Sequence, residues 1–265
     1  MLRENVRVSR AVHRALPQIR RAATCTAVLL ARGGRLLFVG AGTSGRLGIL
    51  EAAECPPTFR TAPSMVQAII AGGRPSVFRS REGAEDDRTS ARALIKRRVR
   101  SGDVVVGLTA SGVTPFVDAA LREASRRGAR TILVTCHPRP TIPAQIRIVL
   151  RTGPEVLTGS TRLKAGAATK LVLNMLTLGA MVRLGKTYGN LMVDVRPTSR
   201  KLRARALRII QMVGGCNARA AARCLRSARG ETKVAILMAA RGVPLRLARR
   251  QLARAYGSLR GALAS

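Results

Sequence analysis

The chain predicts an α/β fold, a doubly wound and mainly parallel sheet with a small helical C-terminal appendage. Short apolar runs alternate with helical stretches through residues 35–150, which is the pattern of strand–helix–strand units. Two of those runs end in loops rich in glycine and hydroxyl side chains. Beyond them the strand pattern stops and glycines separate short helical stretches. We therefore expect one domain over residues 1–197 and a small helical domain over residues 198–265.

The elements of the first domain can be predicted in order. Val12, Leu16 and Ile19 have helical spacing, which predicts one amphipathic helix over residues 8–31. Strands are expected at residues 35–39, 65–70, 103–108, 131–135 and 146–150, and helices at residues 47–53, 88–100 and 115–127. Pro56 and Pro57 are expected to end the helix that follows the first strand.

A longer helix is expected from about Gly159 to Leu184. Its second half, residues 171–182, is apolar almost all round, which predicts burial inside the fold or against another subunit. That stretch is shorter than the roughly 20 apolar residues that a membrane span needs. The N-terminus has no apolar signal core. We expect a cytoplasmic protein without a membrane partner. Further helices are expected at residues 199–213, 217–227, 231–241 and 244–256.

Composition excludes several classes of function. The five cysteines form no CxxC pair and only two histidines are present, so neither a disulfide framework nor a metal site is expected. Lys and Arg total 48 against 13 acids, a formal net charge of +35. Such a balance is typical of proteins that bind polyanions. The basic residues are spread along the chain, and two Tyr, four Phe and no Trp offer little stacking. We expect no specific nucleic-acid partner, only incidental polyanion binding at low salt.

Three helix starts carry the groups that bind a phosphate. Backbone amides and hydroxyls at a helix N-terminus attract anions, and glycines let the chain approach them closely. The candidate residues are Gly42, Thr43, Ser44 and Gly45 after the first strand, Ser111, Gly112 and Thr114 after the third, and Ser160 and Lys164 at the long helix. One such loop is equally well explained as a tight turn. The three together predict a small-molecule sugar-phosphate ligand at the carboxyl ends of the strands.

Two carboxylates are candidates for acid–base work. Glu54 precedes a Pro-Pro pair, and Glu85 follows a glycine-flanked loop. A pair of carboxylates can divide acid and base roles if their environments separate their pKa values. Spacing alone favours ordinary roles, a helix-end residue for Glu54 and a capping residue for Glu85.

Long collinear motifs identify a family. The segments 37–58, 82–86, 159–166 and 189–195 closely resemble the signature of the N-acetylmuramic acid 6-phosphate etherases, which have a sugar isomerase (SIS) domain. The match covers roughly residues 15–215. The regulatory protein of glucokinase is a related family with a longer chain and two SIS domains. Etherase family members usually carry a longer lead before the equivalent of residues 1–15, and that lead helps to shape the dimer and the substrate pocket.

The resemblance implies a reaction and its residues. The family cleaves the lactyl ether of N-acetylmuramic acid 6-phosphate by elimination and hydration, with N-acetylglucosamine 6-phosphate and D-lactate as products. It implies Glu54 as the acid for lactate and Glu85 as the base at C2, with neither metal nor organic cofactor. It also implies a homodimer with active sites near the interface.

The chain departs from the family pattern at a few positions. Val113 replaces an Arg, and His137 replaces an Asn. Two other classes of function stay open. A non-catalytic SIS module would sense a sugar phosphate without releasing lactate, and a basic nucleic-acid binder would keep its affinity at high salt.

Overall fold

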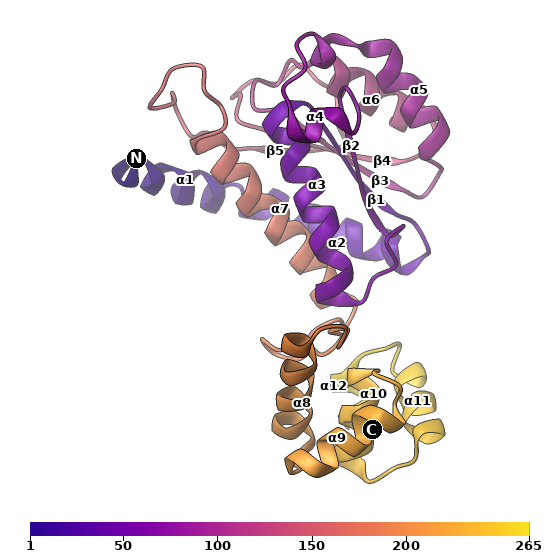
Figure 1. Cartoon of the computed structure of the whole chain (residues 1–265). Helices are drawn as coiled ribbons and strands as arrows, with labels where there is room; N and C mark the ends of the chain where they lie inside the picture. The colour runs from indigo at the N-terminus through magenta and orange to yellow at the C-terminus, as the bar shows by residue number, and fades with distance from the viewer. Residues whose placement is uncertain (265) are drawn as a thin grey trace. The chain divides into compact units, whose positions relative to one another are not determined.

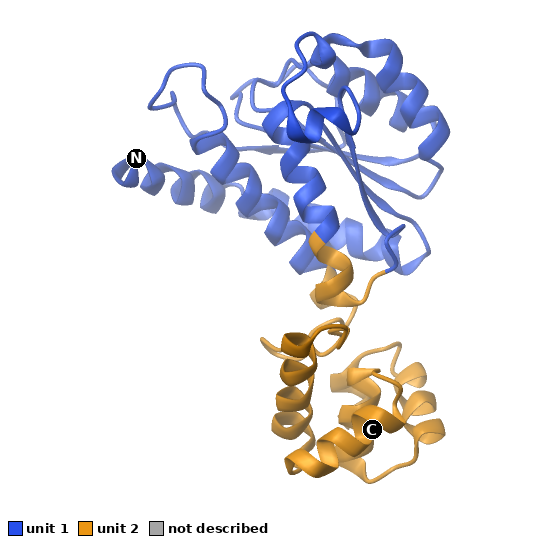
Figure 2. Ribbon diagram, in the orientation of Figure 1, with its two compact units in different colours: residues 1–53, 62–180 blue, residues 54–61, 181–265 orange. Residues whose placement is uncertain are grey.

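The computed structural model describes residues 1–264 and divides into two compact units (Figures 1 and 2). The first unit comprises Met1–Ala53 and Ala62–Ala180, and the second comprises Glu54–Thr61 and Met181–Ser265. The compact units thus change over after Ala180, whereas the sequence suggested a domain boundary at 197/198, which stays a prediction.

A five-stranded parallel sheet forms the centre of the first unit and confirms the predicted fold class. The strands are β1 (Leu36–Gly40), β2 (Val66–Ile70), β3 (Val104–Leu108), β4 (Arg130–Thr135) and β5 (Ile146–Val149). Their order is β2-β1-β3-β4-β5. The chain steps from β1 to one side and then returns to the other side, so the strand order reverses between β1 and β3. Gly40 is in register with Leu108, so the loops after these two strands leave the sheet at the same level.

Helices cover both faces of this sheet (Figure 1). They are α1 (Leu2–Arg14), α2 (Leu16–Ala31), α3 (Gly42–Phe59), α4 (Pro75–Phe78), the 3-10 turn η1 (Ala84–Asp86), α5 (Arg88–Arg98), α6 (Pro115–Arg126) and α7 (Lys164–Arg183). Gly107 of β3 lies under Val117 and Leu121 of α6, where a Cβ would come within 2.8 Å of either side chain. On the other face, a Cβ at Gly48 of α3 would lie 2.8 Å from that of Phe38. Small residues therefore set how closely these helices approach the sheet.

The N-terminal helix differs from its prediction, because two helices replace one. Helix α1 begins at Leu2, ends at Arg14, and is followed by α2 from Leu16. Pro17 lies in the first turn of α2. A proline has no N–H to donate to the carbonyl four residues earlier and suits the first turn of a helix. The break at Ala15 follows from that missing donor.

Two further helix ends differ from their predictions. Helix α3 does not stop at Pro56 and Pro57 but runs to Phe59. Proline's fixed φ suits a helix, and burial of Cys55 and Phe59 on either side offsets the lost hydrogen bonds. Arg60 then ends the helix in a left-handed conformation, with φ +53°. Helix α7 begins at Lys164 rather than near Gly159, after a loop of turns.

Helix α7 is long and apolar enough, by length and composition alone, to cross a membrane. A window of 18 residues within it has a mean hydropathy of 1.4, and 56% of that window is buried. The core helix of a water-soluble protein passes the same test, and α7 buries Val172, Leu173 and Leu176 completely. The predicted burial inside the fold is confirmed for this face. Leu171 and Leu178 on another face are 40% and 49% exposed.

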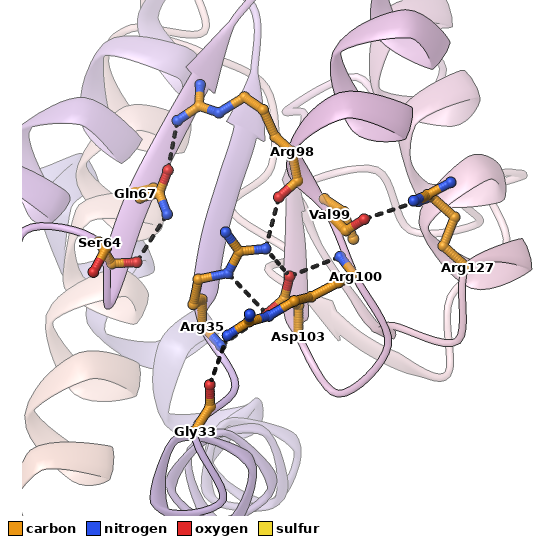
Figure 3. A network of polar contacts seen from close by, with 9 residues as sticks. All are labelled: Gly33, Arg35, Ser64, Gln67, Arg98, Val99, Arg100, Asp103 and Arg127. Carbon is orange, nitrogen blue, oxygen red and sulfur yellow. Dashed lines mark hydrogen bonds and ion pairs between the residues drawn. The ribbon is translucent and has the colours of Figure 1, made fainter.

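A network of arginines at the amino end of the sheet holds β1 and β3 together (Figure 3). The Asp103 carboxylate is fully buried and accepts hydrogen bonds from Nε of Arg35 at 3.1 Å and from the backbone N–H groups of Arg35 and Arg100. The hydrogen bond to Asp103 raises the pKa of the Arg35 guanidinium. Arg98 extends the network to Gln67 of β2, with an Nη2 to Oε1 distance of 2.7 Å. This end of the sheet is therefore structural and fixes the strands whose opposite ends carry the candidate loops.

The second unit is helical, as predicted. Beyond α7 it contains α8 (Arg200–Gly214), α9 (Ala218–Ser227), α10 (Thr232–Arg241), α11 (Leu245–Arg254) and α12 (Leu259–Ala264). Ser199 and Asn217 cap α8 and α9 through their side chains, and Gly215 and Gly242 end helices in the left-handed conformation. Helix α12 is an element that the sequence pattern did not reveal.

Candidate functional site

The candidate site lies where the strand order reverses. Ligands of open α/β sheets bind in the crevice outside the carboxyl ends of the strands at such a point. The loop after β1 leads into α3, and the loop after β3 leads into α6. A Cβ at Gly45 would lie 2.6 Å from Cγ1 of Ile70 and 2.7 Å from the carbonyl oxygen of Gly40. Only a glycine fits there, which brings the N-terminus of α3 close against the end of the sheet.

The loop after β3 gathers three hydroxyl groups at the N-terminus of α6. Oγ1 of Thr109 lies 2.8 Å from Oγ1 of Thr114 and 3.2 Å from Oγ of Ser111. The backbone N–H of Gly112 donates to Oγ1 of Thr109 at 3.2 Å. Gly112 adopts φ +74°, and a Cβ there would lie 2.8 Å from that of His137. The structure thus brings Ser111, Gly112 and Thr114 together.

Thr109 is a member of this cluster that sequence reasoning missed. It directly follows the predicted strand 103–108 and precedes the Ala-Ser-Gly turn. Its signal was its spacing, because it shares one short loop with Ser111 and Thr114.

The third helix start is occupied by the chain's own charges. The Glu155 carboxylate accepts the backbone N–H groups of Lys164 and Ala165, each at 2.9 Å. The Lys164 side chain is fully buried, and its ammonium pairs with Glu4 of α1. The hydrogen bond from Lys164 lowers the pKa of the Glu4 carboxyl. A phosphate contact by Lys164 stays a prediction and would compete with Glu4.

The first and third loops are nevertheless neighbours. A Cβ at Gly166 of α7 would lie 3.8 Å from the methyl group of Thr43. Thr43 and Ser44 therefore begin α3 beside the start of α7, close to the loop that carries Ser160. The starts of α3 and α7, which both carry candidate phosphate groups, therefore lie close together.

A cavity of about 160 Å³ adjoins the glycine loop and contains Glu85. Its lining consists of Ala41, Gly42, Arg46, Ala71, Ser76, Ser80, Arg81, Glu82, Gly83, Ala84 and Glu85. Glu85 is exposed and is not the cap of α5. That role belongs to Asp87, which accepts the backbone N–H of Ser90 at 2.8 Å. The capping interpretation of Glu85 was therefore wrong, and its carboxylate is available at the cavity.

The two glutamates of α3 have different surroundings. Glu51 is buried, and its carboxylate accepts from Nζ of Lys170 at 2.7 Å and from Oγ1 of Thr177 at 2.5 Å. Glu54, one turn later, is exposed and belongs to the segment Glu54–Thr61 of the second unit. The structure thus assigns a structural role to Glu51, while the pairing of Glu54 with Glu85 stays a prediction.

A second cavity of about 400 Å³ lies beside the loops that follow β4 and β5. Cys136, His137 and Thr152 are among its lining residues. Burial raises the pKa of the Cys136 thiol to about 11, which keeps it protonated and unreactive at neutral pH. Within residues 1–264, no three His, Cys, Asp or Glu side chains gather in a group that could hold a metal ion.

Comparisons with known proteins agree with this fold. The chain matches the model of the glucokinase regulatory protein N-terminal SIS domain over residues 19–125 and that of the SIS domain over residues 85–182. Among solved structures, an Escherichia coli CFT073 protein, solved in complex with a ligand, superposes with a TM-score of 0.50 at 17% identity. That match covers 71% of this chain and 92% of the other, and it supports the fold alone.

Much closer relatives are known by sequence. The N-acetylmuramic acid 6-phosphate etherase of Symbiobacterium thermophilum is 52% identical over 242 residues, which are 91% of this chain and 81% of that protein. The protein of the same name from Gloeobacter violaceus is 55% identical over 239 residues, 89% of this chain and 78% of its own length. The chain therefore belongs to the family of N-acetylmuramic acid 6-phosphate etherases.

Proposed function

We propose that this chain cleaves the D-lactyl ether of N-acetylmuramic acid 6-phosphate with water, giving N-acetylglucosamine 6-phosphate and D-lactate in amino sugar recycling. The observation that carries the proposal is the cavity in which Glu85 and the glycine loop of α3 meet, in a chain half identical to proteins named for this activity. The reaction makes the chain a carbon–oxygen lyase.

The phosphate of the substrate binds at the reversal point of the sheet. Hydroxyls of Thr43, Ser44, Ser111, Thr114 and Ser160 donate to its oxygens. The backbone N–H groups of Gly42, Gly45 and Gly112 add donors at the N-termini of α3 and α6, where the helix dipoles favour an anion. Lys164 contributes its positive charge if the phosphate displaces the Glu4 carboxylate from it.

The chemistry needs one base and one acid. In the open-chain aldehyde, the C2 proton is acidic because it is α to the carbonyl. The Glu85 carboxylate removes that proton, the C3–O bond breaks, and Glu54 protonates the departing lactate oxygen. Water then adds across the C2–C3 double bond, with hydroxide adding to C3 and a proton to C2. These steps require positioning and proton transfer only.

We further propose that the chain acts as a homodimer in the cytoplasm. The apolar face of α7 that leaves Leu171 and Leu178 half exposed supports a partner, because a second copy would remove this face from water. A monomer at micromolar concentration in light scattering would contradict this part of the proposal.

The test is D-lactate release from N-acetylmuramic acid 6-phosphate. We expect release by the wild-type chain and none by Glu85→Gln, which should also lose exchange of the C2 proton with solvent deuterium. Glu54→Gln should keep that exchange but lose lactate release. Asp87→Asn is the matched control, because Asp87 lies two residues from Glu85 and only caps α5.

Two outcomes would contradict parts of this proposal. Lactate release by Glu54→Gln at the wild-type rate would remove Glu54 from the mechanism. Sugar-phosphate binding by the wild-type chain without any lactate release would indicate a sensor instead of an enzyme.

A further inference from the structure

The cavity that contains Glu85 also contains a buried hydroxyl without a partner. Ser76 of α4 lines this cavity and is only 4% exposed, and its Oγ has no hydrogen-bond partner within residues 1–264. Nearly all buried polar atoms in proteins are hydrogen-bonded, and an unsatisfied one costs about 1–3 kcal/mol. A hydroxyl left in this state beside a cavity is ready to bond to whatever fills it.

The surrounding chain holds this hydroxyl in place. Gly72 has φ +75°, and a Cβ there would lie 2.2 Å from Oγ of Ser76, so the glycine leaves the space that the hydroxyl needs. Nε of Arg46, from α3, donates to the carbonyl oxygen of Val77 at 2.9 Å. Nη1 of Arg81 donates to the carbonyl oxygen of Gly72 at 3.2 Å. Both arginines thus fix the segment that carries Ser76 to the cavity.

We propose that Ser76 Oγ donates a hydrogen bond to the carbonyl oxygen of the 2-acetamido group of the sugar phosphate. This inference rests on the proposed function, in which Glu85 reaches C2. The acetamido group is attached to that same carbon, and Ser76 lines the same cavity as Glu85. A carbonyl oxygen needs a donor, whereas the carboxylate oxygens of Glu82 and Glu85 are acceptors. Ser76 is thus a specificity residue for N-acetylated sugars.

The test compares two ligands that differ only at C2. Binding of N-acetylglucosamine 6-phosphate and of glucose 6-phosphate is measured by calorimetry. We expect the wild-type chain to prefer the acetamido ligand by about fivefold to tenfold, the contribution of one hydrogen bond. Ser76→Ala should bring this ratio close to one and leave the affinity for glucose 6-phosphate unchanged.

Ser80→Ala is the matched control. Ser80 lines the same cavity, but its exposed Oγ already lies 3.4 Å from Oε1 of Glu82. This variant should keep the wild-type ratio. In the absence of ligand, Ser76→Ala should melt at the same temperature as the wild type or higher, because it removes a hydroxyl that has no partner. A hydroxyl with a purely structural role would lower the melting temperature when removed.

The outcomes separate this inference from the proposed function. If Ser76→Ala loses affinity for both ligands equally, or keeps the wild-type ratio of the two affinities, the acetamido contact is overturned. The proposed function would still stand if lactate release continues. Binding of neither ligand by the wild-type chain would overturn both. Retention of the ratio in an inactive Glu85→Gln would support the contact independently of turnover.

A separate observation concerns the charge of residues 181–265. This segment carries 19 Lys and Arg against two acids, a net charge of +17, whereas residues 1–180 carry +18 over twice the length. Both acids are already paired. Asp194 lies 3.1 Å from Nζ of Lys186 and 2.9 Å from Nζ of Lys233, and Oε1 of Glu231 lies 2.6 Å from Nη2 of Arg249. The exposed arginines of this segment therefore have no acid of their own segment left to neutralise them.

These arginines lie on the outer faces of helices whose apolar faces are buried. In α9, Arg219, Arg223 and Arg226 are exposed at helical spacing, while Ala221 and Leu225 are buried. Helix α9 packs against α8, which exposes a further group of basic residues, Arg200, Lys201, Arg203, Arg205 and Arg208. A helix that inserts into a lipid surface needs a free apolar face, and here the core of the unit uses that face.

We infer that this α8–α9 surface binds the phosphate backbone of double-stranded nucleic acid without sequence specificity. Arginine forms strong, bidentate contacts with phosphate. Stacking on unpaired bases requires aromatic side chains, and neither α8 nor α9 carries one, since Tyr188 precedes α8 and Tyr256 follows α11. The surface thus fits a regular array of phosphates better than single strands.

The test measures affinity for a labelled duplex of arbitrary sequence as a function of salt. The triple variant Arg219→Gln, Arg223→Gln, Arg226→Gln should reduce the slope of log affinity against log salt by up to about 2.7, since each lost phosphate contact removes about 0.9. The control removes equal charge from the first unit, with Arg14→Gln, Arg20→Gln and Arg21→Gln, all exposed. It should keep most of the slope.

An equal reduction in both variants would show that only the overall charge matters and would overturn the assignment to α9. Binding to anionic phospholipid vesicles but not to the duplex, or tighter binding to a single strand, would overturn the choice of partner.

Discussion

Both units bury carboxylates among cations, and Asp103 and Asp194 show two different ways of doing so. In the first unit, Asp103 receives the guanidinium of Arg35 and two backbone N–H groups. In the second unit, Asp194 receives the ammonium groups of Lys186 and Lys233, and Nζ of Lys233 also donates to the carbonyl oxygens of Gly185 and Gly257. Arginine keeps its charge under all conditions, whereas a buried lysine can lose its proton. The stability of the first unit therefore depends more strongly on Asp103 than the stability of the second unit depends on Asp194.

The two carboxylates also differ in their position in the fold. Asp103 precedes β3 and Arg35 precedes β1, so their pair joins the two strands whose other ends carry the candidate phosphate loops. Asp194 lies between α7 and α8, where its cations tie loops of the second unit together. Loss of the first acid affects the sheet, and loss of the second affects the packing of helices.

The largest expected effect is that of Asp103→Ala. It leaves a partly buried guanidinium and two backbone N–H groups without their acceptor, so we expect a loss of about 3–5 kcal/mol in the free energy of unfolding. Urea denaturation measures the loss, and hydrogen exchange should locate it in β1 and β3. Asp118→Ala is the control, because Asp118 pairs with exposed Arg88 and Arg122 and should cost less than about 1 kcal/mol. Equal costs would remove the distinction between buried and surface acids.

A smaller effect is expected for Asp194→Ala. Lys233 keeps two carbonyl acceptors and can release its proton, so we expect a loss of about 2–3 kcal/mol at neutral pH. Denaturation followed by hydrogen exchange of the second unit measures it. A loss as large as that of Asp103→Ala would contradict the comparison.

The pH dependence tests the same lysine. Burial lowers the pKa of the Lys233 ammonium from its ordinary 10.5, and Asp194 opposes that shift. Between the folded pKa and 10.5 the unfolded chain binds more protons than the folded chain, so stability rises with pH across this window. Asp194→Ala lowers the folded pKa further and should widen the window toward neutral pH. A variant whose stability has the same pH slope as the wild type in the range just below pH 10.5 would exclude this coupling.

The smallest effect is expected for Glu231→Ala. Glu231 forms one partly exposed pair with Arg249 on the surface of the second unit, so the free energy of unfolding should change by less than about 1 kcal/mol. The same variant raises the positive charge of the segment, so duplex affinity should rise slightly at low salt. A measurable loss of affinity instead would indicate that this pair positions α11 for binding.

Much of the fold could be predicted from the sequence because the signals are local. Apolar runs bounded by glycines gave all five strands within about two residues, the usual precision of element ends. Pro115 marked the start of α6 correctly. The prediction that prolines end a helix failed at Pro56 and Pro57, since burial of Cys55 and Phe59 outweighs two missing hydrogen bonds. The predicted start of α7 was also wrong, because the carboxylate of Glu155, nine residues earlier, accepts the backbone N–H of Lys164 and sets that start.

The candidate site divides in the same way. Loop composition by itself determined the hydroxyl cluster at α6 and the glycine approach at Gly45, because residues a few positions apart must meet in a tight turn. Only the tertiary structure decided that the Lys164 ammonium pairs with the Glu4 carboxylate, 160 positions away in the sequence. The same holds for the cap of α5, which is Asp87 and not Glu85, and for Ser76, which is buried without a hydrogen-bond partner at the cavity that contains Glu85. The physical reason is that pairing and burial depend on which distant segments share a space, and sequence spacing does not encode that distance.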